Sequence, residues 1–148
     1  MAQTTGAMSG AAATISYQSG GTGSYTDISG SSQSVDVVTL TKMTGEAYTF
    51  DGSYAVLTVG KNEPLEVAVK VLYTETTTEA YSIMLSAFEN GTLISLKWIP
   101  NGTTAGADTY TTSVGQITAI DLPAIDASSA GPVMASFTLR CASITHTP

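Results

Sequence analysis

Residues 63–102 read EPLEVAVKVLYTETTTEAYSIMLSAFENGTLISLKWIPNG, and this segment carries the strongest structural signals of the chain. Apolar side chains occupy every second position from Leu65 to Tyr73, which is the period of a half-buried β-strand. The apolar spacing then changes to the helical period, and Asn90-Gly91 supplies a left-handed stop. Alternation resumes and runs to Trp98. The stretch therefore predicts two strands that flank one short helix, at about Glu79 to Glu89.

The predicted helix has both a start signal and an apolar face. Thr76-x-x-Glu79 is typical of a capping box, in which the threonine hydroxyl accepts a hydrogen bond from the Glu79 amide. Four large apolar side chains follow at helical spacing, so we expect one face of the helix to be buried. These residues are Tyr81, Met84, Leu85 and Phe88.

Strand patterns and turn signals continue on both sides of this segment. We expect further strands at residues 13–19, 35–41, 47–50, 54–59, 109–112, 115–122 and 133–141. Residues 35–41 carry apolar side chains on both faces, which predicts that both faces are covered. Asp51-Gly52 is a strong hairpin signal. About seven to nine strands with one helix predict a mainly-β fold, an antiparallel β-sandwich or barrel with one flanking α-helix.

The chain of 148 residues fits one domain. Residues 1–12 are small and polar without a period, so we interpret them as a flexible or interface arm. Residues 13–148 then form the single domain.

The composition points toward association. Charged residues make up 11% of the chain, against about 25% in ordinary soluble domains, and Thr, Ser and Gly take their place. A surface with few charges is poorly protected against association, so we expect neighbouring subunits to cover much of it. The alternative is an ordinary β domain with a hydroxyl-rich surface.

The net charge and the cysteine count exclude several classes of protein. Twelve acidic and five basic residues give a net charge of −7, which disfavours a nucleic-acid-binding role because that role needs a basic surface. The single cysteine allows no intrachain disulfide. The N-terminal residues lack a signal-peptide pattern, and no apolar run approaches a membrane span of about 20 residues. We therefore expect a soluble protein made in the cytosol.

Residues with catalytic or metal-binding potential are few. His146 stands near the C-terminus, where an exposed, frayed position is expected. Cys141 shares a face with apolar residues of the last strand, which favours an inert core thiol. The acid pairs Glu63 with Glu66 and Asp121 with Asp126 match no calcium-loop spacing. The sequence therefore predicts no catalytic, cofactor-binding or metal site, and no enzyme.

Several segments, in this order and spacing, resemble the tail tube (major tail) protein of long, non-contractile-tailed bacteriophages. The segments are 44–52 (TGEAYTFDG), 60–67 (GKNEPLEV), 73–75 (YTE), 88–91 (FENG), 98–102 (WIPNG) and the closing strand at 131–145. The resemblance covers most of the chain from about Tyr25 onward.

The resemblance implies a β-sandwich with a flanking helix, assembled as hexameric rings that stack into a tube for genome delivery. The implied partners are copies of the chain itself, a tape measure protein, a tail terminator and distal tail proteins. DNA would be present only in transit, no cofactor is implied, and the chain would not insert into a membrane. The implied location is the phage tail in the virion, after synthesis in the host bacterial cytoplasm. We expect residues 1–12 and 42–52 to contribute to contacts between rings.

Two other functions stay open. One is a carbohydrate-binding or adhesin-like β-sandwich, with Trp98 and tyrosines as a stacking platform. Trp98 shares a strand face with Ile94 and Leu96, however, which favours a core position. The other is the tube protein of a contractile secretion-type particle.

Overall fold

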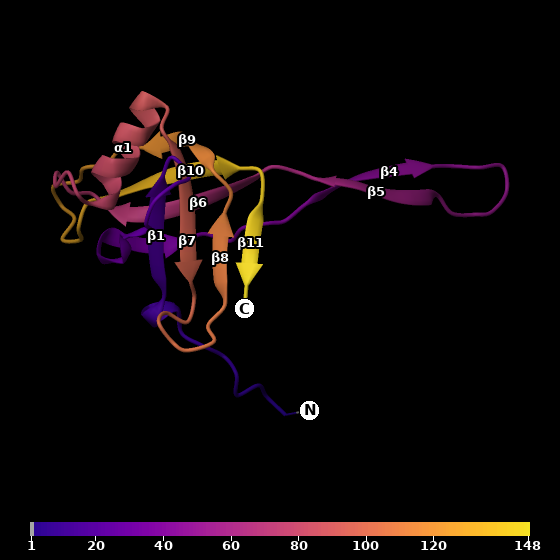
Figure 1. The fold of residues 1–148 in the computed structure, drawn as a ribbon, viewed down its shortest axis with the longest axis horizontal. Helices are drawn as coiled ribbons and strands as arrows, with labels where there is room; N and C mark the ends of the chain where they lie inside the picture. The colour runs from indigo at the N-terminus through magenta and orange to yellow at the C-terminus, as the bar shows by residue number, and fades with distance from the viewer. Residues whose placement is uncertain (1) are drawn as a thin grey trace.

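The computed structural model describes residues 2–148, so Met1 of the expected arm lies outside the described residues (Figure 1). The strands are β1 (Thr14–Ser19), β2 (Thr26–Asp27), β3 (Ser32–Val35), β4 (Lys42–Ala47), β5 (Val56–Asn62), β6 (Leu65–Leu72), β7 (Leu93–Ile99), β8 (Thr109–Thr112), β9 (Gly115–Asp121), β10 (Met134–Cys141) and β11 (Ile144–Thr147). Two 3-10 turns, η1 (Gly10–Ala12) and η2 (Ser29–Ser31), and the helix α1 (Ala80–Asn90) complete the description. The predicted mainly-β fold with one helix is confirmed, and the helix bounds differ from the prediction by one residue at each end.

The strands form two sheets, and every strand pair is antiparallel. The main sheet has nine strands in the order β11-β8-β7-β9-β10-β6-β3, with β1 paired to β7 and β2 paired to β1. The second sheet is the hairpin of β4 and β5, which extends away from the body of the molecule in Figure 1. The chain thus has a compact body and one long projection.

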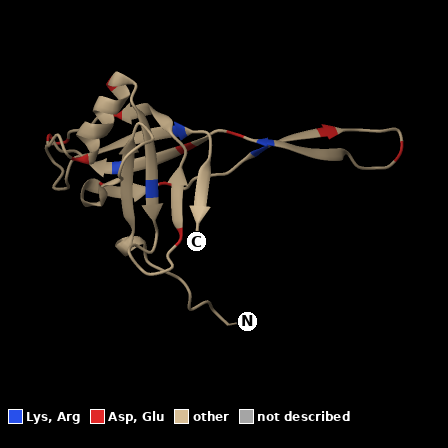
Figure 2. Cartoon of the chain, in the orientation of Figure 1, with Lys and Arg blue, Asp and Glu red and all other residues tan. Residues whose placement is uncertain are grey.

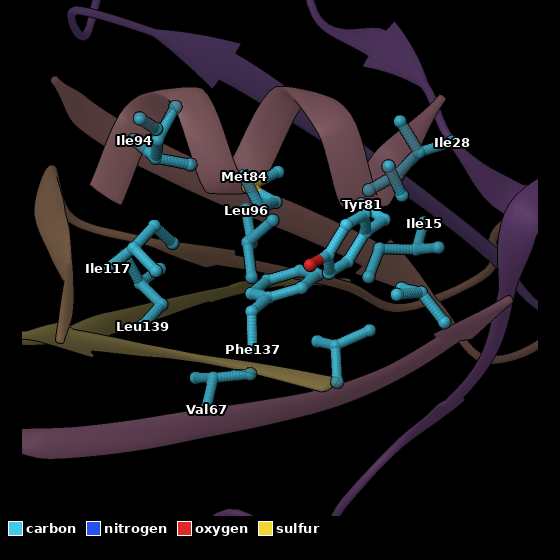
Figure 3. Close-up of a cluster of buried hydrophobic side chains, with 14 of the residues drawn as sticks. Ile15, Ile28, Val67, Tyr81, Met84, Ile94, Leu96, Ile117, Phe137 and Leu139 are labelled. Atoms are coloured by element: carbon cyan, nitrogen blue, oxygen red, sulfur yellow. The ribbon is translucent and has the colours of Figure 1, made fainter. Parts of the chain in front are cut away.

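The core lies between the main sheet and helix α1 (Figure 3). Alternate residues of β6 and β10 are buried, as the period-2 pattern predicts, and Val67 and Leu139 face each other in the register of these strands. Met84 and Tyr81 reach the core from the helix, where Phe137 meets them from β10. Phe88 was expected on the buried face of the helix but is 46% exposed. Ala80 and Ala87 are buried on the helix instead, because close contact with the sheet favours small side chains there.

The helix does not begin with the expected capping box. Its N-cap is Glu79, whose side chain makes no capping hydrogen bond, and the Glu79 amide donates to the Thr76 backbone carbonyl. The Ala80 amide instead donates to the hydroxyl of Ser31 at 3.1 Å. Ser31 is buried in turn η2, which is 49 residues away in sequence. Tertiary structure therefore supplies the cap that the local pattern had assigned to Thr76.

Ser31→Ala tests this cap. We expect a loss of about 0.5–2 kcal/mol in the free energy of unfolding, because a capping acceptor is removed and the buried Ala80 amide loses its partner. Thr76→Ala is the matched control, and we expect a change within about 0.5 kcal/mol because its hydroxyl makes no capping bond. Urea denaturation of both variants measures the difference. A larger loss of unfolding free energy for Thr76→Ala than for Ser31→Ala would instead support the capping box as the helix cap.

The prediction of a strand covered on both faces at residues 35–41 is wrong. Strand β3 ends at Val35, and its pairing with β6 closes one residue later, where the Asp36 amide donates to the Ala68 carbonyl. Beyond that point Val37 is 95% exposed and Leu40 is 70% exposed. The chain leaves the sheet toward the hairpin here, so no second layer covers these apolar side chains.

The hairpin itself is confirmed, but its strands lie closer to the body than predicted. Cross-strand pairing ends at Ala47 opposite Val56, which leaves residues 48–55 as the tip. Gly52 adopts φ +87° within that tip, as the Asp51-Gly52 signal requires. The aromatic residues of the tip have no layer to pack against, so nothing there supports further strand pairing.

Candidate assembly interface

The hairpin of β4 and β5 presents a large amount of apolar surface to solvent. All thirteen residues of its two strands are exposed. The exposed large apolar side chains of the hairpin are Met43, Tyr48, Phe50, Tyr54, Val56, Leu57 and Val59. Monomeric soluble proteins rarely expose contiguous apolar surface of this kind, and such surface marks an interaction site. A two-stranded sheet without a packing partner is also marginally stable in water. The hairpin is therefore a candidate contact surface for another molecule.

The charges of the hairpin are few and segregated. Lys42 and Lys61 stand where the hairpin joins the body, and Glu46 and Asp51 stand nearer the tip. Figure 2 shows the same scarcity of charge over the rest of the molecule. The surface that the hairpin offers is thus mostly apolar and aromatic, with few charges available for ion pairs.

The two ends of the main sheet are unpaired edge strands. The path of paired strands stops at β11 on one side and at β3 on the other. An edge strand presents backbone amide and carbonyl groups that another chain can pair with. Within residues 2–148 the body therefore offers the edges at β11 and β3 to a neighbour, together with the short edge at β2, which pairs only with β1.

An open groove lies on the body beside the base of the hairpin, and its lining includes residues of both edge strands. Its volume is about 860 Å³. The large apolar residues that line it are Ile15, Val35, Val38, Leu40, Trp98, Pro100, Tyr110 and Ile144, and Asp36 is the charged residue among the lining. The groove is therefore a second apolar surface, separate from the hairpin tip.

Three aromatic rings stack across neighbouring strands beside this groove. Trp98 on β7 stacks on Tyr110 of β8, with 5.9 Å between ring centroids, and Tyr110 stacks on His146 of β11 at 5.2 Å. The Nε2 atom of His146 lies 3.2 Å from a carboxylate oxygen of Asp108. His146 is exposed, as expected, but the expected fraying is wrong, because β11 pairs with β8 in register and holds the ring in place. Trp98 is only partly buried: it packs against the core, as expected, but also lines the groove.

The residues with catalytic potential are not brought together. Cys141 is buried, as predicted, and burial raises the pKa of its thiol, which disfavours the reactive thiolate. Glu66 pairs with Arg140 at 3.3 Å, and Asp121 accepts a hydrogen bond from Ser136. Glu66 and Asp121 therefore contact residues other than the acids with which they were paired in the sequence analysis.

The remaining chemistry of the described chain is equally sparse. Hydrogen bonds from Ser128 lower the pKa of Asp126, so this carboxylate is stabilised in its charged form. Among residues 2–148 the side chains of His, Cys, Asp and Glu form no cluster of three that would hold a metal ion. Over the same residues, no helix has the length and apolar character needed to cross a membrane.

Solved structures share this arrangement of strands and helix. A chain of the anti-feeding prophage baseplate superposes with a TM-score of 0.77 at 10% identity, covering 98% of this chain and 97% of that chain. The chain has a phage-tail-type fold. A chain of the sheath–tube complex of an extracellular contractile injection system gives a TM-score of 0.65 at 16% identity, with 90% and 87% coverage. The SPP1 tail tube gives 0.62 at 17% identity, with 95% and 78% coverage.

The likeness is one of fold and not of sequence. No family model and no curated protein matches the sequence. A shared fold at 10–17% identity means that the same buried pattern is satisfied by different residues. The sequence signals that pointed to this fold were the alternation of β6 and β10 and the single capped helix. The groove had no such signal, because its lining comes from five strands that are distant in sequence.

Proposed function

We propose that the chain is a structural subunit that assembles with copies of itself into stacked hexameric rings, forming the tube of a long, non-contractile phage tail. The observation that carries this proposal is the projecting hairpin, whose apolar side chains have no partner within residues 2–148. The tail-type fold supports it, since chains with this fold occur in a 6-fold symmetrised baseplate and in a tail tube. The tube serves as the conduit for genome delivery, and the chain acts in the virion without catalysis.

The composition of the surface agrees with this role. Unpaired edges at β3 and β11 and a scarcity of charge are tolerable where neighbouring copies cover them. A net charge of −7 suits a conduit that passes DNA without holding it, because a basic wall would bind the phosphate backbone. The further partners proposed are a tape measure protein, a tail terminator and distal tail proteins. Synthesis takes place in the cytoplasm of the bacterial host.

A second candidate is the tube protein of a contractile secretion-type particle. The likeness to a chain of the contractile injection sheath–tube complex favours it. The two candidates differ in whether a sheath surrounds the tube. Pull-down of the assembled protein with the sheath protein of the same particle distinguishes them.

The adhesin-like alternative is less well supported by the geometry. Trp98 is only partly exposed, since it packs against the core and Tyr110 stacks on its ring, and the part of it that stays accessible lines the groove. Glycan-array binding would favour this alternative over a tube.

Electron microscopy of the purified protein tests the proposal. We expect rings about six subunits around, or tubes of such rings, because an open repeating contact drives growth. Light scattering at high protein concentration gives an independent measure of assembly. A strictly monomeric protein by both measurements, in the presence of tail initiator proteins, would contradict the proposal.

The N-terminal arm offers a second test. Residues 2–9 lack a helix or strand and are exposed, and only turn η1 follows before β1. Deleting residues 1–12 should stop or shorten tube growth while the thermal unfolding midpoint stays within a few degrees. Tube lengths are measured by negative-stain microscopy. Normal tube lengths from the deletion variant would exclude the arm from the contacts between rings.

A further inference from the structure

The geometry points to the groove beside β3 and β11 as the receptor for the hairpin tip of a second copy of this chain. This inference rests on the proposed function, which supplies the second copy. It adds the place on the body where the tip binds. The tip is defined as residues 48–55, and the groove by the lining residues given above.

The tip and the groove have the same chemistry. Tyr48, Phe50 and Tyr54 of the tip are each more than three-quarters exposed, so no residue of their own chain covers them. The groove is lined largely by apolar and aromatic side chains, including Trp98 and Tyr110. Aromatic rings pair favourably with other rings in offset or edge-on arrangements. Burial of the tip's aromatic side chains in the groove is therefore more favourable than their exposure to water.

The charges also permit this contact. The tip has one charged residue, Asp51, and the groove lining has one, Asp36. Two carboxylates repel each other, so the tip must bind with Asp51 on the solvent side of the groove, away from Asp36. The aromatic side chains then enter the groove and the charged end of the turn stays hydrated.

The groove is large enough to accept these rings. At about 860 Å³ it lies in the upper part of the range of roughly 300–1,000 Å³ typical of ligand pockets. Three aromatic side chains that bury roughly 150–250 Å² each remove roughly 450–750 Å² from water. A standard stable interface buries about 800 Å² per partner. The area that the tip alone would bury thus approaches that of a standard interface. Contacts by the exposed side chains of β5 would increase the buried area further.

The tip cannot occupy the groove of its own chain. The eight steps from Lys42 to Phe50 span about 26 Å at roughly 3.3 Å per residue in an extended strand. In Figure 1 the tip lies at the far end of the hairpin, away from the body. Val38 and Leu40 line the groove while the chain that follows them leads away from it. The occupant must therefore come from another copy.

This pairing has a consequence for symmetry. The tip and the groove are different surfaces of one chain, so each copy donates a tip and accepts one. Such a heterologous contact does not close within a pair, and it extends from copy to copy. Depending on whether the rotation between copies closes, this contact gives either a ring or an open filament.

Cysteine cross-linking between two variants of the full chain tests the inference. Chain carrying Phe50→Cys is mixed with chain carrying Leu40→Cys under mild oxidation. Leu40 lines the groove and is exposed, so neither substitution disturbs the core. We expect a disulfide-linked heterodimer as the main product on a non-reducing gel. The matched control mixes Phe50→Cys with Ile125→Cys, because Ile125 is an equally exposed apolar residue outside the groove. Here we expect at least tenfold less product.

Trp98 fluorescence gives a second readout on unmodified chain. Trp98 is the single tryptophan, so its emission should shift to shorter wavelength and resist acrylamide quenching when a tip fills the groove. Phe50→Ser with Tyr54→Ser should abolish this change. Tubes that form without the Phe50–Leu40 cross-link would overturn the groove as receptor and leave the proposed function intact. Absence of both tubes and cross-links would overturn both.

Discussion

Replacing residues 42–62 by Asn-Gly is expected to give a folded subunit that no longer assembles. The two ends of the hairpin are already joined by a hydrogen bond from the Glu63 amide to the Thr41 carbonyl at 2.8 Å. A two-residue Asn-Gly turn fits between such a pair, and it removes the exposed apolar side chains of the hairpin without touching the core. The assembled fraction, measured by sedimentation velocity and negative-stain microscopy, should fall from most of the protein to none.

The thermal unfolding midpoint of the unassembled variant provides the control. It should match that of the unassembled parent within a few degrees, because no hairpin residue belongs to the core cluster. The pair Phe50→Ser with Tyr54→Ser keeps the hairpin and removes only two aromatic rings. It should weaken assembly without abolishing the strands. Tubes of unchanged length from the Asn-Gly variant would exclude the hairpin from assembly.

Phe137→Ala is expected to remove roughly 3–5 kcal/mol from the free energy of unfolding. Phe137 is 2% exposed at the centre of the core, where it meets Tyr81 and Met84 of the helix (Figure 3). Its removal leaves a cavity that the rigid sheet cannot close. Because domains of this kind are stable by about 5–15 kcal/mol in total, the variant should lose roughly a fifth or more of its stability. Urea denaturation of the unassembled subunit measures the loss.

Phe88→Ala is the matched control because it deletes the same side chain from the exposed side of helix α1. Phe88 is 46% exposed, so we expect a loss below about 1 kcal/mol. Similar losses for both variants would mean that the helix packs on the sheet with a different face.

The sequence predicted the elements whose pattern is local. The alternation in β6 and β10 identified both strands and their buried faces, because burial on one side of a strand requires every second residue to be apolar. The helix was placed within one residue, since Gly91 must adopt its left-handed conformation to end it. Strand β8 was predicted with the observed bounds, Thr109–Thr112.

The predictions that failed depended on neighbours distant in sequence. Ser31 replaces Thr76 as the cap because turn η2 lies against the start of the helix. Val37 and Leu40 read as a buried strand, yet the chain leaves the sheet before them. His146 read as a frayed tail, and pairing of β11 with β8 orders it. The same apolar pattern is compatible with burial by the chain itself or by a partner, and periodicity does not distinguish the two.

Local patterns in the sequence were sufficient to predict the fold class and the position of the helix. These follow from periodicity, turn chemistry and residue type, all of which act over a few neighbouring positions. The projection of the uncovered hairpin, and the apolar groove that five strands build beside the edges at β3 and β11, became apparent from the three-dimensional arrangement alone. Both features arise from where distant segments meet and from where they do not, and that is fixed by packing of the whole chain.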